Sequence, residues 1–460
     1  MAGLTAIAGV VTLSLVARPR TWVEGDEMKR RYGRLGIVMA VAVIAIGTAP
    51  TAGARIRTLT VDDDGAQCRN AGFNTIQSAI TAAEPGDTVR VCGGSYAEAV
   101  SIDKQVVLVA KSPAAPAVDC LARLTAYPAA LAVVRGGLAV TATGSEIDGL
   151  VVTGATVGIT TSDQGSGYRI RRSIIEGNSQ FGIELQSGGD QRTSVERNCV
   201  RGNGTPDAPR AGIAAEMGEL RNTVIRNNIT ADNFEGISIA GPHPHSDVTI
   251  TRNTIRREYG GINISGGAAS EISHNNLDLT GVPAQLDPGS GIAIGGGTSG
   301  LWIDSNVVSG AAGAGLLFSR GIFNDANDEI NVGVVVSNNT IRNNRSGINV
   351  ALPTEGALPN LANSVINNNV ISENVPFSGI SIAPGNNGNM LVGNTSTANG
   401  RWGISLVDLS GTTVVGNTMT GNGVLDANDT ARSQNTWINN TCSTDFPEGT
   451  ICAAAVQSEP

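Results

Sequence analysis

Basic side chains recur at one place in a phrase that is repeated along this 460-residue chain. The phrase reads apolar-x-x-Asn-x-apolar, and we call its Asn, or Ser in one copy, the anchor. In five consecutive copies the residue before the anchor is Arg172, Arg197, Arg226, Arg252 or His274. Copies stacked about 4.8 Å apart would align these side chains, and like charges so close repel unless they are paired or neutralised. We expect this basic stripe to bind an anionic glycan, with a solvated Arg stack as the alternative.

Two other groups of residues could take part in catalysis. His243 and His245 follow a predicted strand at 236–239 and could remove a proton next to a uronate carboxyl. Asp325, Asp328 and Glu329 follow an equivalent strand and offer oxygens of the kind that Ca²⁺ takes. We expect both groups on one side of the molecule. An exposed Pro-rich turn and a solvated acidic loop are the plainer alternatives.

The repeated phrase also predicts the fold. Apolar residues alternate around each anchor with period two, which is typical of short strands. Asn tolerates the αL conformation of a bend, and stacked Asn side chains could hydrogen-bond along the axis. Three strands per copy predict an all-β, single-stranded, right-handed parallel β-helix. The anchors are Ser173, Asn198, Asn227, Asn253, Asn275, Asn306, Asn339, Asn369, Asn394, Asn417 and Asn440.

Glycine and composition agree with this prediction. A Gly stands before an Ile or Leu after most anchors, where a second corner would need positive φ or close approach. The chain has 59 Gly and only 3% aromatic residues, as a narrow aliphatic core would require. The glycines are Gly182, Gly212, Gly236, Gly261, Gly291, Gly315, Gly347, Gly379 and Gly403.

The N-terminal segment has the pattern of an export signal. Basic residues after Met28, an apolar run at 35–46 and small residues at 52–54 predict cleavage after Ala54, with Met28 as the possible true start. A membrane anchor is the alternative, but the run is short for one. Residues 55–135 would form the N-terminal cap and first coils, 136–442 the repeats and 443–460 a C-terminal cap or tail. Without 1–54 the chain keeps 25 Lys and Arg against 37 Asp and Glu, net −12, which argues against nucleic-acid binding.

Six cysteines in an exported chain predict disulfides. Cys68 and Cys92 flank a predicted helix, and Cys442 and Cys452 close a loop at the other end. We expect these two pairs to staple the ends of the fold. Cys120 and Cys199 are left over, and zinc binding is the alternative for the set.

The segment FNTIQSAITAAEPGDTVRVCGGSYAEAVSIDK begins with an amphipathic helix that would cover the first coil. It resembles the N-terminal cap of the pectin-lyase-like, right-handed parallel β-helix superfamily, and the Asn-x-Ile and Gly-Ile phrases resemble its repeats, together over residues 58–442. The superfamily includes lyases, hydrolases, epimerases and adhesins. The resemblance implies a secreted or cell-surface protein, expected to be a monomer outside the membrane, that binds polysaccharide. A uronate lyase or epimerase, with Ca²⁺ as a possible cofactor, and a structural protein without ligand are the alternatives.

Overall fold

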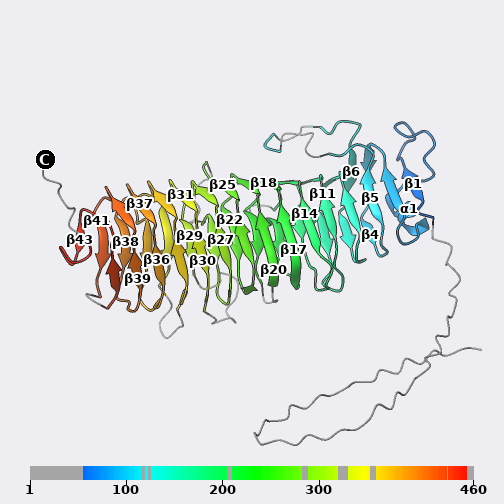
Figure 1. The fold of residues 1–460 in the computed structure, drawn as a ribbon. Helices are drawn as coiled ribbons and strands as arrows, with labels where there is room; N and C mark the ends of the chain where they lie inside the picture. Colours follow the sequence, from blue (N-terminus) through cyan, green and yellow to red (C-terminus); the bar gives the residue numbers. More distant parts are fainter. Residues whose placement is uncertain are drawn as a thin grey trace, which may run out of the picture. The chain divides into compact units, whose positions relative to one another are not determined.

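The computed structural model describes residues 55–114, 120–122, 126–204, 210–241, 243, 245–281, 289–319, 330–352, 359–431 and 434–452. The predicted export signal at 1–54 therefore lies outside the described residues. From Arg55 onward the chain forms one unit of stacked coils (Figure 1). Each complete coil contributes one strand to each of three parallel sheets, A, B and C. The predicted all-β right-handed parallel β-helix is thereby confirmed.

Sheet A has 16 strands. They are β1 Thr58–Val61, β2 Thr88–Val91, β5 Val107–Ala110, β8 Glu146–Asp148, β11 Arg169–Arg171, β14 Thr193–Glu196, β17 Leu220–Arg226, β20 His245–Thr251, β23 Gly267–Ala268, β24 Glu271–Ser273, β27 Trp302–Asp304, β30 Val335–Ser337, β33 Val365–Asn367, β36 Met390–Val392, β39 Thr413–Val415 and β42 Thr436–Ile438.

Sheet B has 13 strands. They are β3 Gly94–Tyr96, β6 Ala132–Arg135, β9 Val151–Thr153, β12 Ile174–Glu176, β15 Cys199–Arg201, β18 Ile229–Ala231, β21 Thr254–Arg256, β25 Asn276–Asp278, β28 Val307–Ser309, β31 Thr340–Arg342, β34 Val370–Ser372, β37 Thr395–Thr397 and β40 Thr418–Thr420.

Sheet C has 14 strands. They are β4 Val100–Ile102, β7 Leu138–Val140, β10 Ile159–Thr161, β13 Ile183–Glu184, β16 Ala211–Ala215, β19 Glu235–Ile239, β22 Gly260–Ile264, β26 Ile292–Ile294, β29 Ala314–Phe318, β32 Ser346–Val350, β35 Ile380–Ile382, β38 Trp402–Leu406, β41 Leu425–Asp429 and β43 Asp445–Phe446.

The anchors form a hydrogen-bonded ladder at the corner between sheets A and B. Each buried Asn accepts a bond from the backbone N–H of the preceding anchor; Asn306 Oδ1, for example, lies 2.9 Å from Asn275 N. One predicted anchor is wrong. The ladder runs through Asn228, not Asn227, because Ile225 is the inward residue that pairs with Val195. The αL residue of this bend is also not the anchor but the residue before it, such as Arg197 with φ 57°.

The Gly residues at the corner between sheets B and C serve close approach rather than positive φ. A Cβ on Gly182 would lie 2.6 Å from the carbonyl oxygen of Gly212 in the next coil. A second Asn ladder lies beside them and includes Asn203 and Asn233. Glu258 takes the next position, accepts two bonds from Asn233 and is fully buried. Burial raises the pKa of Glu258 to about 8, so this ladder position carries a proton near neutral pH.

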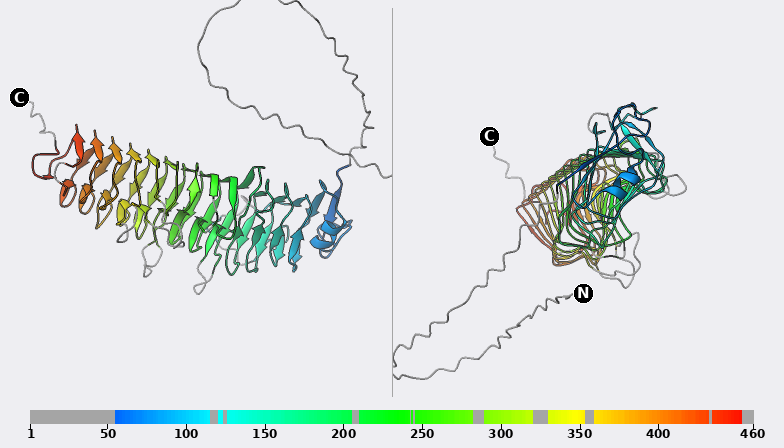
Figure 2. Two further views of the ribbon diagram at one scale, coloured as in Figure 1. Left: turned by 90° about the horizontal axis from the view of Figure 1, so that it is seen from below. Right: turned by 90° about the vertical axis from the view of Figure 1, so that its right-hand side faces the viewer.

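Both ends and one flank are fastened covalently. Helix α1, Ile76–Ala82, turns Ile76, Ala79 and Ile80 inward and lies across the first coils when the molecule is viewed along its axis (Figure 2). The predicted Cys68–Cys92 and Cys442–Cys452 disulfides are present. The third, Cys120–Cys199, ties an excursion between β5 and β6 to the outer face of sheet B.

The same excursion covers a buried ion pair. Arg201 on β15 is 1% exposed and pairs with Glu176 on β12, its neighbour in register. Arg201 also donates to the Cys120 carbonyl at 2.9 Å, and the Tyr127 hydroxyl donates to Glu176. The described part of the excursion thus lies over the Arg201–Glu176 pair on sheet B.

Candidate functional site

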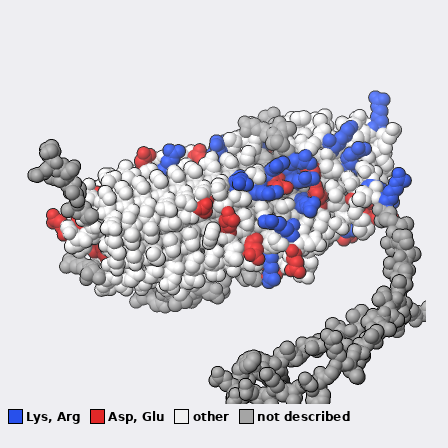
Figure 3. Space-filling view, viewed as in Figure 1, with Lys and Arg blue, Asp and Glu red and all other residues white. Residues whose placement is uncertain are grey.

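The predicted basic stripe is broken. Arg226 stands one place away from its predicted position, since Asn227 occupies the bend and Arg226 aligns with Glu196. The Arg226 and Glu196 side chains form an ion pair of 2.7 Å. Arg172 is paired as well, because its guanidinium donates to Asp148, which raises the pKa of Arg172. The view in Figure 3 shows Lys and Arg gathered over the N-terminal half of this face with Asp and Glu among them, while in the C-terminal half of the same face the few charged residues lie along the upper edge and at the tip.

Arg197, Arg252 and His274 do occupy equivalent bends, each with φ near 55°. With Arg226 missing from the series, the stripe has a gap at its centre. These residues therefore remain scattered turn residues rather than one continuous basic surface.

The two candidate histidines have different environments. His245 is 2% exposed and aligns with the core residue Leu220, so its imidazole lies in the inward row. Burial lowers the pKa of His245 to about 4, which keeps the ring neutral. The prediction that His245 is an accessible base is therefore wrong. His243 is exposed in the loop after β19. The proposed calcium ligands Asp325, Asp328 and Glu329 lie outside the described residues.

The outer face of sheet C brings together residues that the sequence patterns did not single out. One side chain per coil points outward from the middle of each strand, and the register aligns them in a row that we call the floor. Most members are small or polar, which leaves room above the sheet. The floor contains Thr160, Glu184, Ala214, Ser238, Asn263, Ala293, Leu317, Asn349, Ser381, Ser405 and Asn428.

A second row borders the floor where the chain enters sheet C. Backbone hydrogen bonds link consecutive members; Arg345 N donates to Gly313 O, Phe377 N to Arg345 O and Arg401 N to Phe377 O, each at 3.1 Å. We call this row the wall. Arginine and aromatic residues dominate it, and two glycines interrupt it. The wall contains Arg210, Phe234, Tyr259, Gly289, Gly313, Arg345, Phe377 and Arg401.

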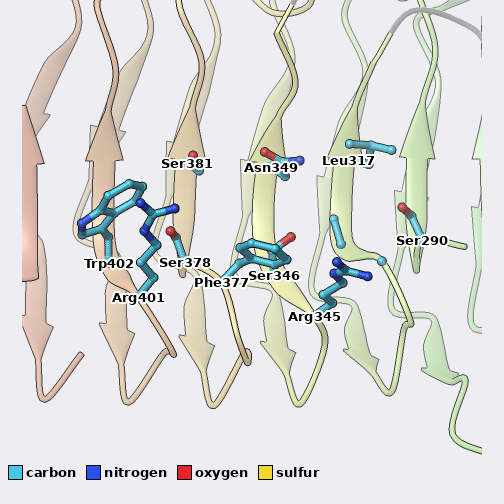
Figure 4. A pocket seen from close by; sticks show the side chains of 12 residues that line it. Ser290, Leu317, Arg345, Ser346, Asn349, Phe377, Ser378, Ser381, Arg401 and Trp402 are labelled. Atoms are coloured by element: carbon cyan, nitrogen blue, oxygen red, sulfur yellow. The ribbon is translucent and has the colours of Figure 1, made fainter. Parts of the chain in front are cut away.

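Floor and wall enclose a pocket at the C-terminal part of the face. Its volume is about 410 Å³. Arg345 lies over the Phe377 ring with 5.1 Å from Cζ to the centroid, and Arg401 lies over Trp402 at 3.8 Å. Figure 4 shows these side chains along one edge, opposite the floor residues Leu317, Asn349 and Ser381. Ser290, Ser346 and Ser378 complete the polar lining.

Three carboxyl groups gather on the same face nearer the N-terminus. Glu184 on β13 is 3% exposed and accepts backbone bonds from Glu216 and Met217 at 3.1 and 3.0 Å. Glu216 follows β16 and lies 3.8 Å from Arg210. Glu235 begins β19 one coil further on. Phe234 and Tyr259 stack beside this cluster with centroids 4.6 Å apart.

Burial raises the pKa values of all three carboxyl groups in this cluster. Burial raises the pKa of Glu184 and of Glu235 to about 7, and the neighbouring Glu216 carboxylate raises both further. Burial also raises the pKa of Glu216, while the Ser238 hydroxyl and Arg210 lower it. Carboxyl groups whose pKa values are moved toward neutrality can donate or accept protons at physiological pH.

A sequence signal for this face does exist. Wall residues stand three places before the Ile or Leu of each Gly-Ile or Gly-Leu phrase, as in Arg345-Ser346-Gly347-Ile348 and Phe377-Ser378-Gly379-Ile380. Reading that position down the copies reveals its arginine and aromatic residues. Glu184 would stand out as a charge within a short apolar strand.

Comparison with known proteins gives a partial family match. Residues 130–296 match the family model described as periplasmic copper-binding protein (NosD). No curated protein matches the chain in sequence. Solved structures to which the chain is similar include pectate lyase Pel9A, at 17% identity over 69% of this chain and 76% of that one, with a TM-score of 0.42. The A-module of the Azotobacter vinelandii mannuronan C-5 epimerase AlgE4 shares 14% identity over 79% and 89%, also with a TM-score of 0.42.

Thiolate and imidazole groups, which bind copper, form no ligand set among the described residues. All six cysteines form disulfides, and the three histidines occupy the core, a loop and a bend. Within the described ranges, the one group of three His, Cys, Asp or Glu side chains that could hold a metal is Asp62, Asp63 and Asp64.

Two further observations bear on the setting of the protein. No helix in the described part of the chain has the length and hydropathy needed to cross a membrane. Three disulfides are typical of proteins outside the reducing cytoplasm. Together with the three-sheet coil, they describe a disulfide-bonded, right-handed parallel β-helix protein.

Proposed function

We propose that the protein is secreted and binds an anionic polysaccharide along the outer face of sheet C. The observation that carries this proposal is the pocket in which Arg345, Phe377, Arg401 and Trp402 adjoin a floor of hydroxyl and amide groups. The face replaces the basic stripe as the expected binding surface. It runs parallel to the axis, as a linear polymer requires.

The chemistry of the pocket matches an acidic sugar chain. Aromatic rings offer apolar surface to the faces of sugar rings, while Ser and Asn side chains can hydrogen-bond hydroxyl groups. Arg345 and Arg401 present guanidinium groups, which suit planar carboxylates. Neither has an ion-pair partner among the described residues, so both charges are available to a ligand.

The alternative of a uronate lyase or epimerase is less well supported. Of its two proposed bases, His245 is buried and neutral, whereas His243 is exposed; its proposed calcium ligands lie outside the described residues. A purely structural role would leave the paired arginine and aromatic residues without a purpose.

Binding of polygalacturonate and alginate to the purified protein tests the proposal. We expect wild-type binding that weakens with added salt, because exposed charges are screened. The double variant Arg345→Ala/Arg401→Ala should bind at least about tenfold more weakly, since charge-assisted contacts typically contribute about 1.5–3 kcal/mol each. Arg342→Ala is the matched control, because Arg342 is exposed on β31 of sheet B. Equal loss in the control, or no binding by the wild type, would refute the proposal.

A further inference from the structure

The carboxyl cluster on sheet C is assembled from three successive coils. Glu184 aligns with Ala214, and Ala214 aligns with Ser238, which places the three coils directly next to one another. Glu216 lies just beyond the C-terminal end of β16, and Glu235 lies at the N-terminal end of β19. The two carboxyl groups thus approach the Ser238 position from opposite ends of the strands, on the same outer face of sheet C.

Ser238 supplies an independent sign that this place accepts a ligand. Its side chain is fully buried, yet its hydroxyl makes no hydrogen bond of normal geometry. The hydroxyl is nevertheless close enough to Glu216 and Glu235 to lower the pKa of both carboxyl groups. Buried polar atoms are rarely left unpaired without a functional reason. Glu184 Oε2 is a second buried atom without a partner at the same place.

The surroundings distinguish the two outer carboxyl groups. Arg210 lies 3.8 Å from Glu216 and favours its ionised form. Glu235 is influenced by Glu216 and Ser238 but by no cation, so it favours the protonated form. Unequal environments of this kind assign an acid and a base to two like groups. Glu184 accepts hydrogen bonds from the backbone N–H groups of Glu216 and Met217 and thereby fixes the position of the Glu216 segment.

We propose that Glu235 and Glu216 form a hydrolytic centre that cleaves a glycosidic bond of a polysaccharide bound along sheet C. The bond between the anomeric carbon and the glycosidic oxygen breaks, and Glu235 gives its proton to that oxygen. A water oxygen bonds to the anomeric carbon, and Glu216 takes the proton that the water loses. The step needs no oxidant or reductant. It rests on the proposed binding function, because the same face holds the polymer.

Charge also indicates which sugar the centre accepts. Three neighbouring carboxyl groups disfavour a uronate at this position, whereas Arg345 and Arg401 favour one further along. Four coils separate β19 from β32, which corresponds to about 19 Å at the usual strand spacing. The substrate class is therefore a mixed polymer, in which uncharged sugars and uronates occur within a few residues of each other. The stacked Phe234 and Tyr259 rings offer the uncharged sugar an apolar surface.

Hydrolysis is tested with polymers that differ in charge pattern. Hyaluronan alternates uronate with an uncharged amino sugar, glucuronoxylan has an uncharged backbone with uronate branches, and polygalacturonate carries a charge on every residue. New reducing ends and binding are measured on the same samples. We expect cleavage of at least one mixed polymer and none of polygalacturonate.

Three variants identify the groups responsible. Glu235→Gln and Glu216→Gln should each lower cleavage at least about 100-fold while binding is retained. Glu271→Gln, which changes an exposed carboxylate on β24 of sheet A, should cleave as the wild type does. A melting curve for each protein shows whether it is folded. Wild-type activity should also fall as the pH rises above about 7, where the acid loses its proton.

The outcomes separate the two proposals. Binding of a mixed polymer without new reducing ends would overturn the hydrolytic centre and leave the binding function intact. Cleavage by Glu235→Gln at the wild-type rate would overturn it too. Absence of binding to these three polymers and to alginate would refute both proposals.

Discussion

Sheets B and C differ in whether their buried carboxyl groups are paired with a cation. On sheet B, Arg201 and Glu176 face each other in adjacent coils, and a disulfide-bonded excursion covers the pair. On sheet C, Glu184 and Glu235 have no cation at ion-pair distance among the described residues. Instead, burial raises the pKa of each to about 7. The first arrangement suits a closed structural contact. The second suits a surface that exchanges protons or admits a ligand.

Removal of Arg201 should have the largest effect on stability. Arg201→Ala leaves Glu176 buried beside apolar residues without its cation, and such changes typically cost about 3–5 kcal/mol. Thermal and denaturant unfolding would measure the loss. If the variant unfolds with nearly wild-type stability, the contact on sheet B is not a structural one, and the contrast with sheet C fails.

Glu184→Gln should change how stability depends on pH. The folded pKa of Glu184, about 7, lies above its ordinary value of 4.5, so the folded protein holds this proton more tightly than the unfolded chain. Wild-type stability should therefore fall as the pH rises from about 4.5 through about 7, by on the order of 1–3 kcal/mol. The Gln variant should lack this part of the loss. Unfolding at pH 5 and pH 8.5 compares them, and parallel behaviour would show that Glu184 ionises normally.

Asn374 lies in the ladder at the corner between the two sheets and should contribute equally at every pH. Its Oδ1 accepts from Asn344 N and Nδ2, both at 3.1 Å, and its side chain is fully buried. Asn374→Ala leaves these donors unpaired, at a cost of about 1–3 kcal/mol. Unfolding curves at the same two pH values should shift by the same amount. A strongly pH-dependent shift would mean that the ladder is coupled to the carboxyl groups.

The exposed pair of Arg226 and Glu196 should matter least. Arg226 is 48% exposed, and surface ion pairs typically contribute about 0–1 kcal/mol. Arg226→Ala should therefore unfold almost as the wild type does and should leave polyuronate binding unchanged. Loss of binding in this variant would restore the basic stripe as a candidate surface.

Most of the fold could be predicted because the anchors make the same hydrogen bonds at the same corner in every coil. The prediction failed at Asn227, where two asparagines are adjacent and both Val224 and Ile225 are apolar, so alternation alone permits two registers. Thr230 then takes the inward place that an apolar residue takes elsewhere, which made the wrong register look better. That single shift placed Arg226 in a stripe that does not form.

The candidate site was harder to predict because its residues come from different coils and from different positions within the coil. Glu184 belongs to the floor, Glu235 precedes a corner Gly, and Glu216 follows a strand. They meet only after the chain has wound through two full turns. The wall is regular enough to be read from the sequence, but only once the Gly-Ile phrase is known to begin sheet C.

Because floor and wall gain one residue per coil, distances along the axis change in fixed steps. Each coil adds one residue to every row, at about 4.8 Å from the last. Insertion or deletion of a whole coil between β22 and β29 would change the distance from the carboxyl cluster to the arginine pocket by one such step and leave the residues of both sites unaltered. Selection could thereby match the protein to polymers of different repeat length without building a new site.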